Sequence, residues 1–143
     1  MSLHGTYDPD NIFAKIIRGQ MPAVKVFEDD QVLCFMDVFP QARGHMLVIS
    51  KTSQARNLLE AEAKTLGRLI GATQKAAAAV TKALKPDGVI VTQFNGAPAG
   101  QTVFHLHFHV IPRYEGEAMG RHAEGMADVE ALKALAEKIA AAL

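Results

Sequence analysis

Three histidines alternate with apolar residues in the stretch GQTVFHLHFHVIPRY, which runs from Gly100 to Tyr114. They are His105, His107 and His109, half of the six histidines in the chain. Side chains alternate between the two faces of a β-strand, so the imidazoles are predicted on one face at intervals of about 6.5–7 Å. The residues between and beside them would face a core on the other side, and they are Phe104, Leu106, Phe108 and Val110. Pro112 is expected to end the strand because it lacks a backbone N–H.

This row of imidazoles indicates chemistry, because burying three titratable rings for packing alone would leave several polar groups unsatisfied. One interpretation is a zinc site, in which His-x-His supplies two ligands and His45 or Asp37 supplies another. The other is nucleophilic catalysis at phosphorus, in which a neutral imidazole forms a phosphohistidine intermediate. Neighbouring imidazoles would then orient the nucleophile and donate to phosphate oxygens.

The loop before the histidines favours a phosphate ligand. Gly96 and Gly100 allow the backbone to approach a ligand closely. Uncharged hydrogen-bonding side chains stand beside the histidines, namely Asn95, Gln101 and Thr102. The sequence has neither a Walker A motif nor a Gly-x-Gly-x-x-Gly motif, so the phosphate would not be held as in the common nucleotide folds.

The composition limits the class of protein. A chain of 143 residues is long enough for one domain with its own core, so a single domain over 1–143 is expected. Fifteen basic and fifteen acidic residues give no net charge, which argues against nucleic-acid or membrane partners. The one cysteine, Cys34, lies in an apolar stretch and is expected to be a buried thiol. No signal peptide or membrane span is recognised, so a cytoplasmic protein is expected.

The elements that must position the histidines follow from residue periodicity. A short helix is predicted over NIFAKIIRG with Asn11 as its cap, and a long helix over residues 58–84. Strands are predicted on both sides of the acidic turn at 28–30, over 45–50 and over 88–95. A final helix should begin after Asp128, while Arg121 and His122 are expected in a solvated loop. Because strands mostly follow one another, we predict an α+β fold with an antiparallel meander.

The motif GQTVFHLHFHVIPR matches the His-φ-His-φ-His-φ-φ signature, φ being apolar, of the histidine triad (HIT) family. The stretch from NIFAKIIRG to HMLVISK also resembles that family's N-terminal half. The resemblance covers about residues 11–114 and leaves 115–143 as a C-terminal extension. It implies an antiparallel sheet of about five strands with a short N-terminal, a long and a C-terminal helix. It also implies a homodimer without a cofactor, which binds purine nucleotides such as AMP and cleaves them at the α-phosphorus through a nucleotidyl-histidine.

Roles for individual residues come from the same resemblance. His107 matches the nucleophile and His109 the contact to phosphate oxygens, while His105 and His45 match a supporting hydrogen-bond relay. Gln101 and Thr102 match contacts to the phosphate and leaving group, and Asn95 falls in the phosphate and ribose loop.

The nucleoside pocket is carried over in the same way. Asp37 resembles the carboxylate that binds the ribose hydroxyls. The apolar wall around the base would comprise Ile12, Phe13, Ile16, Phe35 and Val38. Packing in a core accounts for these five apolar residues equally well.

One departure from the family concerns zinc. Some bacterial relatives hold a structural zinc with cysteines of the first helix and a histidine after the third strand, where this chain has Ala14 and Ser53. The ligand set is therefore missing.

Three functions remain open: a nucleotidyl-transferring hydrolase, a zinc hydrolase, and a regulatory nucleotide-binding module. Within the first, the opening NIFAKIIRGQMP and the turn FEDD resemble the adenosine 5'-monophosphoramidase branch more than the dinucleoside polyphosphate hydrolases.

Overall fold

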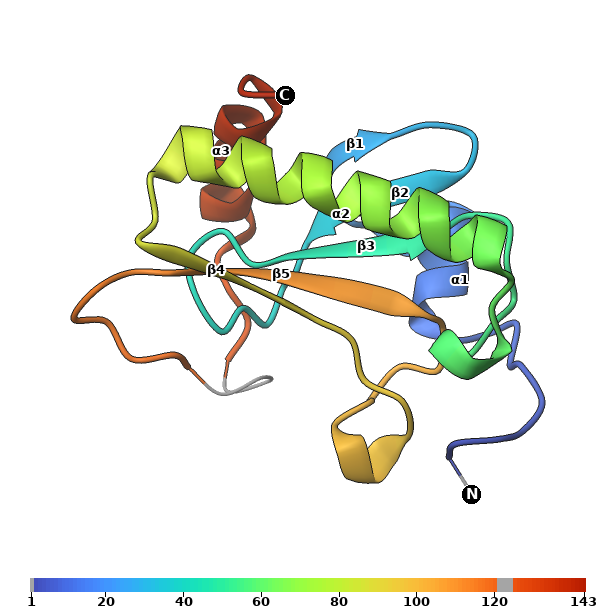
Figure 1. Cartoon of the computed structure of the whole chain (residues 1–143). Helices are drawn as coiled ribbons and strands as arrows, with labels where there is room; N and C mark the ends of the chain where they lie inside the picture. The colour runs from blue at the N-terminus through green and yellow to red at the C-terminus, as the bar shows by residue number, and fades with distance from the viewer. Residues whose placement is uncertain (1, 121–124) are drawn as a thin grey trace.

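The computed structural model describes residues 2–120 and 125–143, so the expectation for Arg121 and His122 lies outside the described residues. Five strands of the described chain form one antiparallel sheet in the order β1-β2-β3-β5-β4 (Figure 1). The bounds are Lys25–Glu28 for β1, Val32–Met36 for β2, Met46–Ser50 for β3, Gly88–Thr92 for β4 and His107–Arg113 for β5. The predicted α+β class is confirmed.

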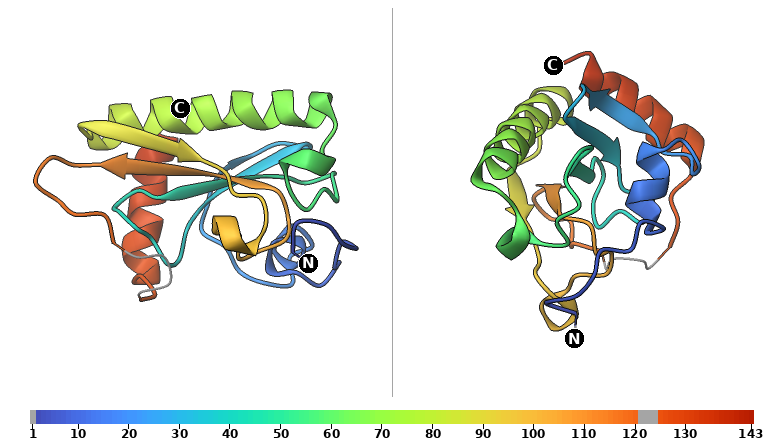
Figure 2. Two further views of the ribbon diagram at one scale, coloured as in Figure 1. Left: turned by 60° about the horizontal axis from the view of Figure 1, so that its bottom comes forward. Right: turned by 90° about the vertical axis from the view of Figure 1, so that its right-hand side faces the viewer.

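The helices cover the sheet unequally. The α-helices are Ile12–Ile17 (α1), Ala63–Leu84 (α2) and Val129–Ala140 (α3). Two 3-10 turns, Leu58–Glu60 (η1) and Ala97–Ala99 (η2), lie in the connections. Helices α2 and α3 lie on one face of the sheet, and the short α1 lies on the other (Figure 2). No helix in the described ranges is long and apolar enough to cross a bilayer.

The sheet departs from a simple meander at one point. Strand β5 lies between β3 and β4, so β4 is an edge strand although it follows β3 in the chain. The 22-residue α2 separates β3 from β4 and carries the chain across the sheet, which leaves space for β5 beside β3. The strand with the histidines therefore has a hydrogen-bonded neighbour on each side.

Local sequence signals account for most element ends. The side chains of Asn11 and Asp128 cap α1 and α3 by accepting from the backbone N–H groups of Ala14 and Ala131, as predicted. In the turn between β1 and β2, the Asp29 carboxylate accepts hydrogen bonds from the backbone N–H groups of Gln31 and Val32. The long helix begins at residue 63 rather than 58, because the chain first makes the 3-10 turn η1.

The histidine strand differs from its prediction at both ends. It begins at His107, so His105 lies in the preceding bend. Phe104 is half-buried, with its ring under the Arg56 guanidinium at 4.9 Å instead of in the core. Pro112 does not end the strand. The Arg113 carbonyl accepts a hydrogen bond from the backbone N–H of Asp87, on the β4 side of the strand. The backbone groups of successive residues point to opposite sides, so the nitrogen of Pro112 faces the β3 side. Pairing with β3 has already ended at Val110, so the missing N–H of Pro112 leaves no hydrogen bond unmade there.

Two apolar clusters flank the sheet. The larger packs the α2 and α3 faces against alternate strand residues, including Leu106, Phe108 and Val110 as predicted. It also contains Cys34, which is fully buried with its sulfur 3.8 Å from that of Met46. Burial raises the pKa of the Cys34 thiol to about 12. The smaller cluster joins α1 to the opposite face, on the histidine side.

Gly44 sets the chain direction immediately before His45. Its φ of +90° is unfavourable for residues with a side chain. A Cβ there would lie 2.7 Å from Leu84 Cδ1 and 3.2 Å from both Val80 Cγ2 and Pro112 Cγ. Glycine therefore lets the start of β3 approach α2 and β5 closely.

We predict that Gly44→Ala lowers the free energy of unfolding by roughly 1–3 kcal/mol, because backbone strain and overpacking both act at this position. Urea unfolding followed by circular dichroism measures the change. Gly71→Ala is the matched control, because Gly71 lies inside α2 with no atom within 4 Å of an added Cβ. It should stabilise the protein by about 0.5–1 kcal/mol. Equal stability of Gly44→Ala and the wild type would contradict the assignment.

Candidate active site

The register of β3 and β5 places the histidines beside the smaller apolar cluster. His107 pairs with Ile49 and His109 pairs with Leu47, and directly paired residues project from the same face of a sheet. Ile49 and Leu47 belong to the cluster that includes Phe13 of α1. The Phe13 ring meets the His107 ring edge-on at 4.9 Å between centroids. The imidazoles are thus buried on the α1 side of the sheet.

The position of its proton defines the chemistry of His107. Its Nδ1 lies 2.7 Å from the carbonyl oxygen of His105. A carbonyl oxygen only accepts hydrogen bonds, so Nδ1 carries the proton. In the neutral ring Nε2 then holds the lone pair, and this is the tautomer that a nucleophile at phosphorus requires.

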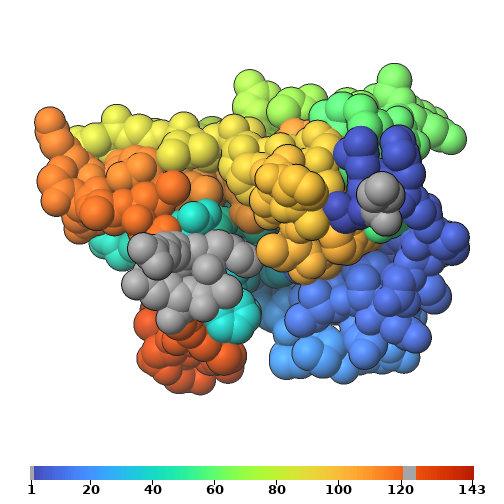
Figure 3. Space-filling view, turned by 90° about the horizontal axis from the view of Figure 1, so that it is seen from below, coloured from blue at the N-terminus to red at the C-terminus, as the bar shows by residue number. Residues whose placement is uncertain are grey.

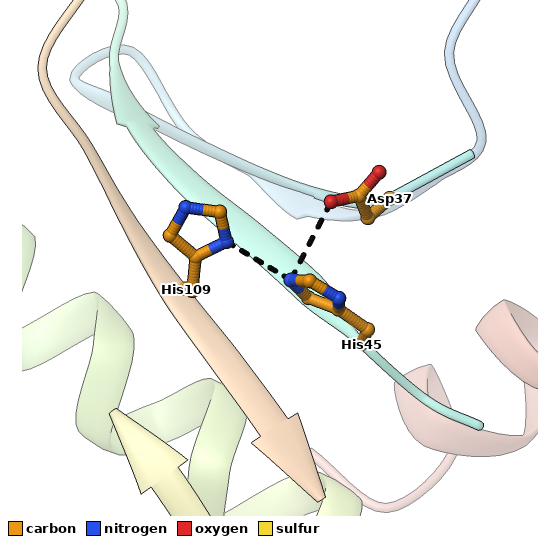
Figure 4. A group of neighbouring side chains, drawn as sticks. All are labelled: Asp37, His45 and His109. Carbon is orange, nitrogen blue, oxygen red and sulfur yellow. Dashed lines mark hydrogen bonds and ion pairs between the residues drawn. The ribbon is translucent and has the colours of Figure 1, made fainter. Parts of the chain in front are cut away.

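A second hydrogen-bond chain fixes the opposite tautomer in His109 (Figure 4). The backbone N–H of Gln41 donates to Nδ1 of His45 at 3.0 Å, so the proton of neutral His45 lies on Nε2. This Nε2–H donates to Nδ1 of His109 at 2.9 Å and lies 3.4 Å from Oδ2 of Asp37. His109 therefore carries its own proton on Nε2, where it is a hydrogen-bond donor.

His105 has a third arrangement. Its Nε2 donates to the carbonyl of Ser50 at 3.0 Å, and its Nδ1 accepts from the hydroxyl of Tyr7 at 2.7 Å. Burial is the main influence on this ring and lowers the pKa of His105 to about 4, so it is neutral at pH 7. His105 therefore supports His107 through its backbone carbonyl, while His45 supports His109.

The loop before the triad is shaped by two of the predicted site residues. The buried amide of Gln101 accepts from Gly96 N at 2.8 Å and donates to the carbonyls of Arg56 and Val103. Asn95 Oδ1 accepts from Leu58 N at 2.9 Å. Both side chains therefore hold the loop in place, and their contact with a phosphate stays a prediction.

The two remaining loop residues are arranged differently. Gly100 has a φ of +109°, which glycine adopts without strain. Thr102 is exposed and lies two residues after Gly100.

The predicted pocket wall is only partly assembled. Phe13, Ile16 and Phe35 are buried in the smaller cluster, and the Phe13 ring contacts the His105 and His107 rings. Ile12 is 44% exposed. Val38 is half-buried and packs against the larger cluster. Asp37 is buried, and its Oδ1 accepts from Phe39 N at 2.8 Å.

Two aromatic residues of the site were missed by the sequence reasoning. Tyr7 contacts His105, and the Phe94 ring lies 5.4 Å from the His109 ring. Tyr7 precedes every periodic segment, so no pattern linked it to a residue 98 positions later. Phe94 lies near the end of the strand predicted over 88–95, and its place beside the glycine loop was the available signal.

Asp37, His45 and His109 are the described residues best placed to hold a metal ion, since their ligand atoms lie within 4.8 Å of one another. The 2.9 Å between His45 Nε2 and His109 Nδ1 suits a shared proton. It is shorter than the roughly 3.3 Å between two nitrogen ligands of a tetrahedral zinc ion. A zinc ion would have to displace that proton and separate the rings.

The family's structural zinc position is a different place. Ala14 and Ser53, the positions that the family resemblance assigns to zinc ligands in some bacterial relatives, line a cavity of about 160 Å³ together with Tyr7 and His105. A methyl group and a hydroxyl replace the cysteine and histidine ligands there, so this donor set does not fit zinc.

Comparisons with known proteins show the family to which the chain belongs. The family model described as HIT domain matches residues 18–116. The chain is 39% identical to adenosine 5'-monophosphoramidase hnt1 of Schizosaccharomyces pombe, over 71% of this chain and 73% of that protein. It is 36% identical to adenylylsulfatase HINT3 of Arabidopsis thaliana, over 82% of this chain and 62% of that protein.

A solved structure extends the likeness to nearly the whole chain. The crystal structure of a Hit-like protein from Bartonella henselae superposes with a TM-score of 0.92 at 52% identity. The match covers 97% of this chain and 100% of that one, so it includes the C-terminal helix beyond the shared motif. With its alternating histidines at and just before an interior strand of a five-stranded antiparallel sheet, this chain belongs to the histidine triad family.

Proposed function

We propose that this protein is a nucleotidyl-transferring hydrolase that cleaves purine nucleotides at the α-phosphorus, with adenosine 5'-monophosphoramidates as substrates. The hydrogen bond from His107 Nδ1 to the His105 carbonyl carries the proposal, because it leaves the lone pair of the neutral ring on Nε2. Two relatives named adenosine 5'-monophosphoramidase and adenylylsulfatase support the reaction class.

The reaction proceeds in two displacements. Nε2 of His107 attacks the α-phosphorus, a phosphorus–nitrogen bond forms to the ring, and the bond to the leaving amine breaks. The amine departs with a proton taken up from solvent. Water then attacks the same phosphorus and returns a proton to solvent, the bond to His107 breaks, and AMP is released. His109 donates from Nε2 to a phosphate oxygen in both steps, because His45 holds its Nδ1 as an acceptor.

The nucleoside would occupy the α1 side of the sheet. Phe13, Ile16 and Phe35 provide the apolar wall for the base, and Asp37 binds the ribose hydroxyls. Asp37 lies 3.4 Å from His45 Nε2, so sugar binding and the His45–His109 chain share one carboxylate. The loop with Gly100, Gln101 and Thr102 surrounds the phosphate.

We predict that His107→Ala lowers kcat by about 10³-fold or more and leaves the Kd for AMP within a few-fold of wild type, because a nucleophile acts in the transition state. Wild-type protein quenched with acid during turnover should carry one nucleotidyl group, detected by mass spectrometry. Near-normal kcat in the variant, or no trapped adduct on the wild type, would contradict covalent catalysis.

Asp37→Asn is the matched control, since it should raise the Kd for AMP while the protein still forms an adduct. Dialysis against EDTA tests the zinc hydrolase alternative in the same preparation. Activity is expected to survive dialysis, whereas loss of activity and its recovery with one equivalent of zinc would favour the metal mechanism. A protein that binds AMP tightly without turnover would instead be the regulatory module.

Charge distribution favours mononucleotide substrates over dinucleoside polyphosphates. A second nucleotide adds negative charges that usually require arginine or lysine contacts. The two arginines nearest the triad in sequence have other partners. Arg43 stacks on the Tyr114 ring at 4.6 Å, and Arg113 donates to the Glu117 carbonyl at 3.1 Å.

We therefore expect a higher kcat/KM for an adenosine phosphoramidate or an aminoacyl adenylate than for diadenosine tri- or tetraphosphate. One preparation at fixed ionic strength should be used, because substrate charge makes binding salt-dependent. A tenfold preference for the dinucleotide would assign the chain to the other branch and leave the role of His107 unchanged.

A homodimer is part of the proposal. Strand β4 is an edge of the sheet and has Val91 45% exposed, and Ile70 of the neighbouring α2 is 52% exposed. An unpaired strand edge and exposed apolar side chains are features that a second copy of the chain would cover in a dimer.

Light scattering at micromolar concentration should give about twice the chain mass. A charged residue on the proposed interface, as in Val91→Glu, should shift the mass toward one chain. Leu59→Glu is the control and should leave the mass unchanged, because Leu59 is also an exposed apolar residue but lies in η1, away from the proposed interface. A wild-type monomer would exclude the dimer.

A further inference from the structure

We propose that Tyr7 is a positioning residue for the nucleophile, held in place by an N-terminal strap formed by residues 2–7. The inference rests on the proposed function, because it assigns what orients His107 for attack. It concerns a segment that precedes the residues 18–116 matched by the HIT domain.

The strap is tied along its length to the loops around the triad. Ser2 Oγ accepts from Ala97 N at 2.7 Å, and the Asn57 side chain donates to the Leu3 carbonyl at 2.8 Å. Gly5 lies so close to the Arg56 guanidinium that an added Cβ would be 3.0 Å from Nη1. In Figure 3 the strap (dark blue) lies beside the loop around residues 95–102 (yellow to orange).

Arg56 joins the strap to the residue before the triad. Its guanidinium is buried and lies over the Phe104 ring at 4.9 Å, with the Gly5 backbone close by. Phe104 directly precedes His105. The strap and the bend at residues 103–105 are therefore packed through one side chain as well as through hydrogen bonds.

The last residue of the strap, Tyr7, contacts a histidine of the triad. Tyr7 donates its hydroxyl to Nδ1 of His105 at 2.7 Å, while Nε2 of the same ring donates to the Ser50 carbonyl. The imidazole is thereby clamped between the strap and β3. Without the hydroxyl, a buried acceptor is left unmatched, and a proton shift to Nδ1 would break the bond to Ser50.

This clamp affects His107 through the backbone. The carbonyl that holds His107 Nδ1 at 2.7 Å belongs to His105, which lies outside the paired part of β5. That segment is held by the His105 side chain and by the bond from Leu106 N to the Ala55 carbonyl. Loss of the Tyr7 hydroxyl therefore loosens the carbonyl that fixes the nucleophile's tautomer and aim.

The test is Tyr7→Phe in the full chain, with an adenosine phosphoramidate as substrate. We expect kcat and the single-turnover rate of adduct formation to fall about tenfold while KM stays within twofold, because only orientation for attack is lost. Tyr114→Phe is the matched control. It also removes a hydrogen-bonded tyrosine hydroxyl, but this one donates to the backbone carbonyl of Arg43, beyond the other end of β5. Its kcat should equal that of the wild type.

A spectroscopic measurement separates positioning from general destabilisation. Long-range ¹H–¹⁵N spectra of the imidazoles should show His105 protonated at Nε2 and His107 at Nδ1 in the wild type and in Tyr114→Phe. Tyr7→Phe should change the His105 pattern and shift the His107 signals. Unchanged spectra together with kcat within twofold of wild type would overturn the role of Tyr7.

Failure of the proposed function gives a different result. If the wild type neither turns over the phosphoramidate nor forms the adduct, hydrolysis at His107 is wrong. The ring spectra then still decide whether Tyr7 controls the tautomers of His105 and His107.

Discussion

The site depends on a hydrogen bond between two residues of the same strand end, from the His107 ring to the carbonyl of His105. A neutral imidazole has one proton and two nitrogens, so the carbonyl decides which nitrogen is a nucleophile. It also sets the ring at a fixed angle to the strand. The carbonyl that makes this bond lies in the bend before β5, whereas Nδ1 of His109, within the strand, is bonded to His45 instead. The neighbouring rings then need partners of their own.

Each histidine of the triad receives a different partner, and the partners come from different parts of the fold. His109 is held by His45 at the start of β3, and His45 by the backbone of the loop before it. His105 is held by β3 and by the strap. Three chemically identical side chains thus become a lone-pair donor, a proton donor and a neutral buried support. This difference arises from the partner on the second nitrogen of each ring.

Sequence reasoning succeeded where the signal lay in a single segment. Alternation placed Leu106, Phe108 and Val110 in the core, and capping chemistry gave the starts of α1 and α3. It failed where separate segments meet. The place of β5 between β3 and β4 depends on contacts between segments far apart in the sequence, and no local pattern encodes this. Nothing in the sequence indicated that the Gln101 amide is buried and bonded to the backbone of two other segments, because those partners lie far away in the chain or in the loop itself.

The thiol of Cys34 is fully buried in the larger cluster, on the face of the sheet away from the histidines. Its raised pKa keeps it protonated, and a protonated, enclosed thiol does not react with alkylating reagents. Because the chain contains one cysteine, every modification event reports the same place. A maleimide can label Cys34 only after β2 separates from the helix layer. The labelling rate is therefore the opening rate multiplied by the fraction of openings in which the reagent reacts before the sheet closes again. Labelling of Cys34 therefore reports opening of the sheet, and a ligand that binds only the closed protein on the other face would slow labelling by a factor of one plus the ratio of ligand concentration to Kd.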